Sequence, residues 1–172
     1  MTVSSIPPSG SSHSDTAKTG LMQGKKGLVM GVANDRSIGW GIAAAAAGQG
    51  AELAFTYQGD ALKKRVNPLA ESVGSNIVLP CDVTDEISVD LVFKTLKEKW
   101  GKLDFLVHAI AYSDKEELKG GYVDTTRENF QKTMEISVYS FTALARRAAD
   151  IMPNGGSLLT TVSYTHLTLP TT

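Results

Sequence analysis

One short segment of the chain has glycines where a phosphate-binding turn would need them. Residues 31–41 read GVANDRSIGWG, with glycine at positions 31, 39 and 41. A nucleotide diphosphate requires glycine where the chain turns sharply and where the backbone approaches the anion. A helix that starts beside this turn adds free N–H groups and the positive end of a dipole. The common G-x-G-x-x-G spacing is absent, so a dinucleotide site and a turn with packing roles only are both compatible with the segment.

Polar residues directly follow the second and third apolar runs of the chain. Gln58 could hydrogen-bond the hydroxyls of an adenosine ribose, or it could be an ordinary solvated loop residue. Residues 57–59 include no Arg or Lys, which disfavours a 2′-phosphate, although Arg36 in the glycine turn keeps that alternative open. Asp82 could bind an adenine amino group with Val83 packed beside the ring, or it could only cap a turn.

The remaining reactive side chains indicate no further chemistry. Cys81 is the single cysteine, and with no histidine or basic neighbour it is interpreted as a small buried residue rather than a nucleophile. We expect His108 to be a packed or hydrogen-bonded histidine. The three histidines lack metal-ligand spacing and one cysteine cannot build a four-cysteine centre, so no metal site is expected.

The apolar pattern predicts the elements that position these residues. Short apolar runs at 26–32, 52–56, 76–79, 103–108 and 156–160 predict strands, and they alternate with helical patterns at 38–47, 60–73, 86–100 and after a long loop at 109–126. Such alternation indicates an α/β fold, a doubly wound parallel sheet of about five strands (Rossmann-like), whose ligands bind beyond the carboxyl ends of the strands. Ser37 is expected to cap the first helix and Pro68 to interrupt the second. The last helix should turn Phe130, Met134, Val138, Phe141 and Ala145 inward.

Length and charge limit the classes of protein that fit. The chain has 172 residues and a net charge of -1, from 17 basic and 18 acidic residues, which suits one domain and disfavours a nucleic-acid partner. No apolar run approaches the ~18 residues that would span a membrane. Residues 1–23 contain six serines and are expected to be a disordered N-terminal segment. The folded domain is expected at 24–161, with a tail at 162–172 outside it, in a cytoplasmic protein.

Five stretches of the chain carry a family resemblance. They read GVANDRSIGWGIA, GAELAFTYQGD, IVLPCDV, LDFLVHAIAY and EISVYSFTALAR. Together they resemble the NADH-dependent enoyl-acyl-carrier-protein reductases of bacteria, a divergent branch of the short-chain dehydrogenase/reductases. The resemblance covers about residues 24–160. It is specific, because an ordinary member of that superfamily has a shorter glycine turn and N-N-A-G in place of HAIA.

The resemblance implies a cofactor, a substrate and a set of contacts. It places Gly31, Ser37 and Ile38 at the cofactor diphosphate, Gln58 at the adenosine ribose, Asp82 and Val83 at the adenine, Ile110 near the nicotinamide ribose, and Ser113 at the substrate. The implied cofactor is NADH, which in the family gives hydride to the β carbon of a trans-2-enoyl chain held on acyl carrier protein in fatty acid biosynthesis. The resemblance also implies a homotetramer.

The family's catalytic Tyr-(six residues)-Lys motif follows the fifth strand, where this chain reads TVSYTHLTLPTT. Tyr164 is therefore not assigned, and the pairs Tyr57/Lys64 and Tyr112/Lys119 are interpreted as coincidences of spacing. No catalytic residue is assigned, and the chain is expected to be C-terminally truncated, inactive as written and prone to association. A non-catalytic NAD-binding fragment and a short-chain reductase of a small carbonyl compound are the alternatives.

Overall fold

The computed structural model describes residues 20–161, in which five strands form one parallel sheet. The strands are β1 (Lys26–Met30), β2 (Glu52–Tyr57), β3 (Ile77–Pro80), β4 (Phe105–His108) and β5 (Ser157–Thr160). Their spatial order is β3-β2-β1-β4-β5, so the direction of chain progression reverses between β1 and β4. This topology confirms the predicted doubly wound parallel sheet, and it predicts a crevice at the carboxyl ends of β1 and β4.

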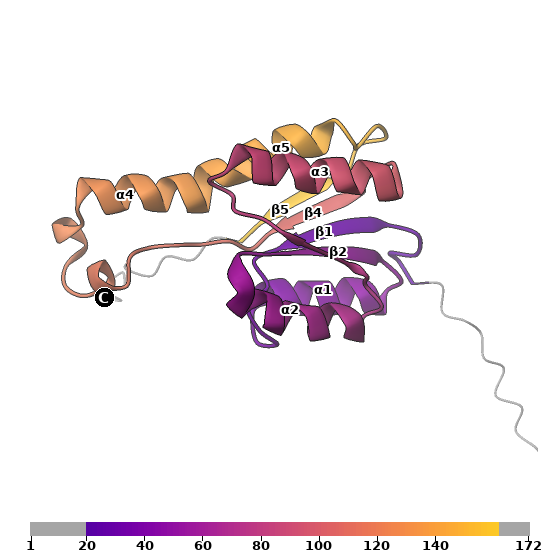
Figure 1. Ribbon diagram of the computed structural model, residues 1–172, viewed down its shortest axis with the longest axis horizontal. Helices are drawn as coiled ribbons and strands as arrows, with labels where there is room; N and C mark the ends of the chain where they lie inside the picture. Colours follow the sequence, from indigo (N-terminus) through magenta and orange to yellow (C-terminus); the bar gives the residue numbers. More distant parts are fainter. Residues whose placement is uncertain (1–19, 162–172) are drawn as a thin grey trace, which may run out of the picture.

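Helices cover both faces of the sheet. They are α1 (Ile38–Gly48), α2 (Gly59–Ser72), α3 (Glu86–Trp100), α4 (Arg127–Met134) and α5 (Ser140–Ala149), with a π-helical turn η3 (Glu135–Tyr139) between the last two and 3-10 turns η1 (Glu116–Leu118) and η2 (Tyr122–Asp124) before them. Helices α1 and α2 lie on one face and α3 and α5 on the other, whereas α4 runs on beyond the sheet (Figure 1).

The core is divided by the sheet into two apolar clusters. Along β1, Leu28 and Met30 pack on the side of α3 and α5, and Val29 packs on the side of α1 and α2. All three side chains are fully buried, because successive side chains of a strand point to opposite faces and both faces are covered here. Burial on both sides is the physical reason why these strands read as continuous apolar runs.

The predicted interruption of the second helix at Pro68 is wrong. Helix α2 continues through Pro68 to Ser72. Pro68 lies on the exposed side of the helix, where water can satisfy the carbonyl that loses its N–H partner. The buried side chains of Val66 and Ala70 hold the helix against the sheet on both sides of the proline. Packing therefore outweighs the local preference.

The predicted inward face of the last helical segment is wrong over its first part. Phe130, Met134 and Val138 are 46%, 41% and 46% exposed. Phe141 and Ala145 are half-buried, and the buried residues of α5 are its neighbours Leu144 and Ala148. Two features cause the difference. The π-helical turn adds a residue and shifts the helical register between α4 and α5, and α4 extends past the layer of strands that would cover its apolar side.

The ordered fold begins slightly before the predicted boundary. Residues 20–23, assigned above to a disordered segment, form a turn in which the Met22 N–H donates to the Gln49 carbonyl at 3.0 Å and the Met22 side chain packs on the core. The other expectations for the two ends concern residues 1–19 and 162–172, outside the described part. Within residues 20–161, no helix combines the length and apolar character that a membrane crossing requires.

We predict that Phe55→Ala lowers the free energy of unfolding by about 3–5 kcal/mol. The Phe55 ring is fully buried, and its centroid lies 6.4 Å from that of the Trp40 ring, so alanine leaves a cavity between α1 and the sheet. Urea unfolding followed by circular dichroism measures the change. As a control, Ile87→Ala removes a side chain that is 72% exposed and should change stability by less than about 0.5 kcal/mol. Equal losses in both variants would contradict this description of the core.

Candidate functional site

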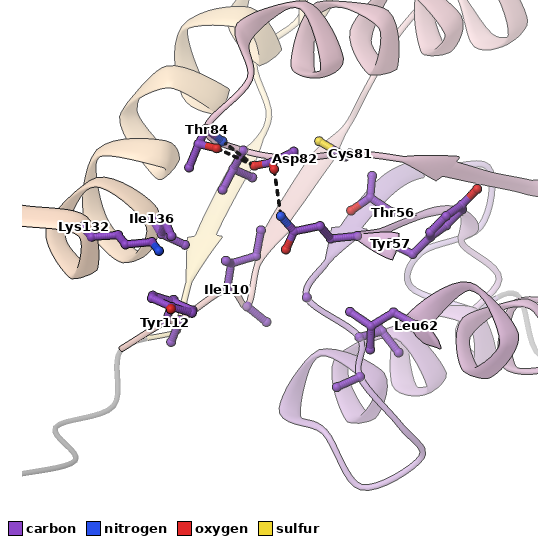
Figure 2. A pocket seen from close by; sticks show the side chains of 17 residues that line it. Thr56, Tyr57, Leu62, Cys81, Asp82, Thr84, Ile110, Tyr112, Lys132 and Ile136 are labelled. Atoms are coloured by element: carbon purple, nitrogen blue, oxygen red, sulfur yellow. Dashed lines mark hydrogen bonds between the residues drawn. The ribbon is translucent and has the colours of Figure 1, made fainter. Parts of the chain in front are cut away.

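A cavity of about 490 Å³ opens at the carboxyl ends of the strands, as the topology predicts. Its walls come from the ends of β1, β2, β3 and β4 and from the α4–η3 segment (Figure 2). The lining residues are Gly31, Val32, Ala33, Thr56, Tyr57, Gln58, Leu62, Cys81, Asp82, Val83, Thr84, Ala109, Ile110, Ala111, Tyr112, Lys132 and Ile136. Residues distant in sequence thus meet around one volume large enough for a ligand.

Gly31 lies where the chain leaving β1 closely approaches the chain leaving β4. Its φ of +89° is in the left-handed region, and a Cβ atom there would lie 2.0 Å from the Ala109 carbonyl oxygen. The Ala109 N–H donates to the Met30 carbonyl at 3.0 Å, which holds the two chain segments together. Only glycine fits this position, so the cavity keeps a bare backbone surface that a phosphate group could approach.

The turn after Gly31 leads into α1 without the cap expected of Ser37. Ser37 occupies the N-cap position, but its side chain accepts no hydrogen bond from the first turn of the helix. The Ser37 hydroxyl donates to the Asn34 carbonyl at 2.7 Å and accepts from the Ala33 N–H at 3.4 Å. It therefore stabilises the preceding loop, residues 33–37, instead of the helix. Ser37 and Ile38 lie outside the cavity lining, and the Ile38 side chain is 65% exposed.

Asp82 joins the ends of β2 and β3. Its Oδ1 accepts from the N–H and hydroxyl of Thr84, at 2.9 and 2.7 Å, and its Oδ2 accepts from the Gln58 amide nitrogen at 2.8 Å. The Thr84 hydroxyl is the main cause that lowers the pKa of Asp82, opposed by partial burial and assisted by the Thr84 and Gln58 N–H groups. Asp82 is thus an ionised carboxylate that both caps a turn and orients Gln58.

Five of the eight residues predicted as contacts line this cavity: Gly31, Gln58, Asp82, Val83 and Ile110. Ser113 lies outside the lining, on the loop after β4. The amide nitrogen of buried Asn129 donates to the Ser113 hydroxyl at 3.1 Å, and its oxygen accepts from the Asp114 N–H at 2.9 Å. The loop that carries Ser113 is therefore attached to α4, next to the cavity wall.

Sequence reasoning missed Lys132 and the role of Tyr112. Both line the cavity, with the Lys132 ammonium 5.0 Å from the centroid of the Tyr112 ring (Figure 2). Within residues 20–161, Lys132 makes no ion pair with a carboxylate and is the only cation among the lining residues. Lys119 instead pairs with Glu116 at 2.7 Å, which agrees with the interpretation of the Tyr112/Lys119 spacing as a coincidence.

His108 and Cys81 both have the structural roles expected of them. His108 is completely buried, with Nδ1 2.9 Å from the Thr160 hydroxyl and Nε2 2.8 Å from the Ser140 hydroxyl. Burial lowers the pKa of His108 below its ordinary value, so the neutral ring is favoured at neutral pH. Burial also raises the pKa of the Cys81 thiol to about 11, which makes it a poor nucleophile at neutral pH. In the described part of the chain, no group of acidic, histidine or cysteine residues could hold a metal ion.

Comparison with known proteins assigns this chain to a family. The family model described as Enoyl-(Acyl carrier protein) reductase matches residues 31–171. The match begins at Gly31, directly after β1, and includes all the other strands. The chain belongs to the enoyl-acyl-carrier-protein reductase family. The resemblance seen in the sequence is confirmed.

Individual relatives agree with this assignment. Enoyl-[acyl-carrier-protein] reductase [NADH] 1 of Rhizobium meliloti is 62% identical over 146 residues, 85% of this chain and 54% of that protein. The Rickettsia felis enzyme is 53% identical, over 85% and 56% of the two chains. A reductase structure from Anaplasma phagocytophilum in complex with NAD is 60% identical with a TM-score of 0.79, over 82% of this chain and 54% of that one. The chain spans about half the length of the curated relatives it matches.

We predict that Thr84→Val raises the pKa of Asp82 towards the ordinary value of about 3.9. The variant removes the hydroxyl that contributes most to lowering it. Because the folded-state pKa lies below the unfolded one, the hydroxyl's stabilisation is present at neutral pH and is lost as the pH falls through the folded pKa. Carbon-detected NMR titration of the carboxylate measures the shift. Thr95→Val, which removes an exposed hydroxyl bonded to the Leu91 carbonyl, is the control and should leave Asp82 unchanged. An unaltered titration in Thr84→Val would contradict the assignment.

Proposed function

We propose that the whole protein is an NADH-dependent enoyl-acyl-carrier-protein reductase of fatty acid biosynthesis. The observation that carries the proposal is the bare backbone at Gly31, in the wall of the same cavity as the hydrogen-bonded pair Gln58 and Asp82, in a chain of this family. When bound, NADH supplies the hydride that reduces the trans-2 double bond of an enoyl thioester. The proposed substrate is the enoyl chain on acyl carrier protein.

The cavity residues suit the parts of a dinucleotide. Gly31 lines the cavity with backbone alone, which the diphosphate can approach, and a side chain there would push the end of β4 away. Asp82 and Val83 lie at the proposed adenine position, with the carboxylate able to accept from an amino group. Ile110 offers apolar contact near the proposed nicotinamide ribose.

Three predicted contacts lie outside the cavity lining and are supported by the family resemblance. They are Ser37 and Ile38 to the diphosphate, and Ser113 to the substrate. The homotetramer and the cytoplasmic location belong to the same proposal, supported by family membership alone.

Asp82 also supports a preference for NADH over NADPH. Because the Gln58 amide nitrogen donates to Asp82, the remaining polar atom of that side chain is its carbonyl oxygen, an acceptor. A ribose 2′-hydroxyl can donate to this oxygen. A 2′-phosphate is mostly a dianion without a proton at neutral pH, and it would meet both the oxygen and the Asp82 carboxylate as repulsive neighbours. The orientation imposed by Asp82 therefore excludes the phosphate more strongly than a glutamine alone would.

We predict that the whole protein binds NADH at least about tenfold more tightly than NADPH, a difference of roughly 1.4 kcal/mol. Fluorescence titration with both cofactors measures this. Gln58→Arg should narrow the preference, because a guanidinium can pair with the phosphate. Gln49→Arg places the same charge at the exposed end of α1 and serves as the control. Tighter binding of NADPH by the unmodified protein would contradict the proposed cofactor, and absence of thioester-dependent NADH consumption would contradict the proposed reaction.

We predict that Gly31→Ala weakens NADH binding by at least about tenfold. Alanine at this position combines a φ of +89° with a contact of 2.0 Å to the Ala109 carbonyl oxygen, so the ends of β1 and β4 must separate. The dissociation constant is measured by fluorescence titration and the folded state by circular dichroism. Gly41→Ala, in α1, meets nothing within 4 Å and should bind normally. Normal binding by Gly31→Ala would show that the diphosphate does not approach this backbone.

A further inference from the structure

The turn η3 is an irregular joint that divides one long helix into α4 and α5. In it the Ser140 N–H donates to the Glu135 carbonyl, five residues back. An α-helix would direct this N–H to Ile136, four residues back. The Ser140 hydroxyl takes that place and donates to the Ile136 carbonyl at 2.6 Å. Single π-helical turns inside α-helices are frequently found at functional sites.

Buried His108 fixes the Ser140 hydroxyl from the other side. The one proton of that hydroxyl is committed to the Ile136 carbonyl, so its oxygen accepts a hydrogen bond from the His108 Nε2–H at 2.8 Å. The neutral ring then has a bare Nδ1, which accepts from the Thr160 hydroxyl at 2.9 Å. Each hydroxyl thus holds a different nitrogen of the same ring, and only the Ser140 side leads to η3.

The residues held by η3 face the cavity. Ile136 and Lys132, one turn earlier, line it together with Tyr112 (Figure 2). Ser137, inside the turn, accepts from the Tyr112 N–H at 3.0 Å and donates to the Tyr112 carbonyl at 3.3 Å. If η3 relaxed to an α-helix, the extra residue would rotate α4 relative to α5 by about 100°. Such a rotation would carry these side chains out of the cavity wall.

We propose that His108 and Ser140 are positioning residues, whose hydrogen bond, closed on the Ile136 carbonyl, holds η3 in its π-helical form and thereby places Ile136, Lys132 and Tyr112 around the bound cofactor. The consequence for catalysis rests on the proposed function. Neither residue lines the cavity, so both act only through the turn.

Ser140→Ala and Thr160→Val form a matched pair for testing this in the whole protein. Each removes one hydroxyl bonded to the buried imidazole, so both should lower the melting temperature, and Ser140→Ala should lower it more because it also loses the hydrogen bond to the Ile136 carbonyl. Ser140→Ala should also lower kcat/KM for NADH-dependent reduction of a crotonyl thioester by about 10- to 100-fold, the scale expected when groups around the reactants are misplaced. Thr160→Val should stay within about twofold of the unmodified protein.

Two substitutions of His108 test whether restoring the hydrogen bond to Ser140 restores activity. In His108→Gln the amide nitrogen can occupy the position of Nε2 and donate to Ser140, whereas in His108→Asn the amide reaches only the Thr160 side. We therefore expect His108→Gln to retain more activity than His108→Asn at comparable stability. The reverse order, or equal losses of kcat/KM in Ser140→Ala and Thr160→Val, would overturn the proposal and leave a purely structural role for the ring.

Amide hydrogen exchange tests the conformation of η3 without any ligand. In Ser140→Ala, the exchange rates of the backbone amides of residues 132–140 should differ from those of the unmodified protein, and in Thr160→Val they should be unchanged. Native protection in both variants would overturn the inference whatever the activity. If the unmodified protein neither binds NADH nor reduces the thioester, the proposed function fails, while the exchange data still decide whether Ser140 holds the turn.

Discussion

The close parallel pairing of β1 with β4 is the constraint on which the other parts of this structure depend. Two glycines of the first strand and its exit allow it. A Cβ on Gly27 would overlap the Phe105 ring at 2.0 Å, and a Cβ on Gly31 would overlap the Ala109 carbonyl at the same distance. The register between them, from Gly27 opposite Phe105 to Met30 opposite His108, brings the two strand ends level. The cavity forms there because the chain leaving β1 and the chain leaving β4 enter helices, α1 and α5, that cover opposite faces of the sheet.

The sequence predicts the parts of the fold that depend on burial. Parallel strands covered on both faces must be apolar throughout, so the five runs identify five strands, and helix α3 has the predicted bounds because its apolar period matches one contact face. The position of the cavity follows from topology, which is why Gln58 and Asp82 are found from their places after strands. Their mutual hydrogen bond is not readable from the sequence, because it depends on how two loops 24 residues apart meet.

The errors share one physical cause, since each concerns a place where the tertiary surroundings outweigh the local pattern. Pro68 is tolerated because it faces solvent on a helix anchored by buried neighbours. The sequence could not show that Lys132 lies beside Tyr112. The path of the long loop between β4 and α4 cannot be predicted, and the π-helical turn breaks the regular helical period. That turn is stabilised by a hydroxyl and a buried imidazole, and hydrophobic periodicity carries no information about either. Site residues that are positioned by a hydrogen-bonded turn of this kind can be identified only when the backbone structure is known.

The outer edge of β3 has a feature that disfavours pairing with a strand of another chain. Strand β3 is the border strand beside β2, and the N–H of the following residue, Cys81, donates to the Tyr57 carbonyl at 2.8 Å. Because N–H groups alternate in direction along a strand, residue 80 would point its N–H away from the sheet, towards any foreign strand. That residue is Pro80, which has no N–H to give. A short border strand that ends in proline presents few outward N–H groups, so it is a poor template for amyloid-like pairing, and the sheet loses no internal hydrogen bond by it.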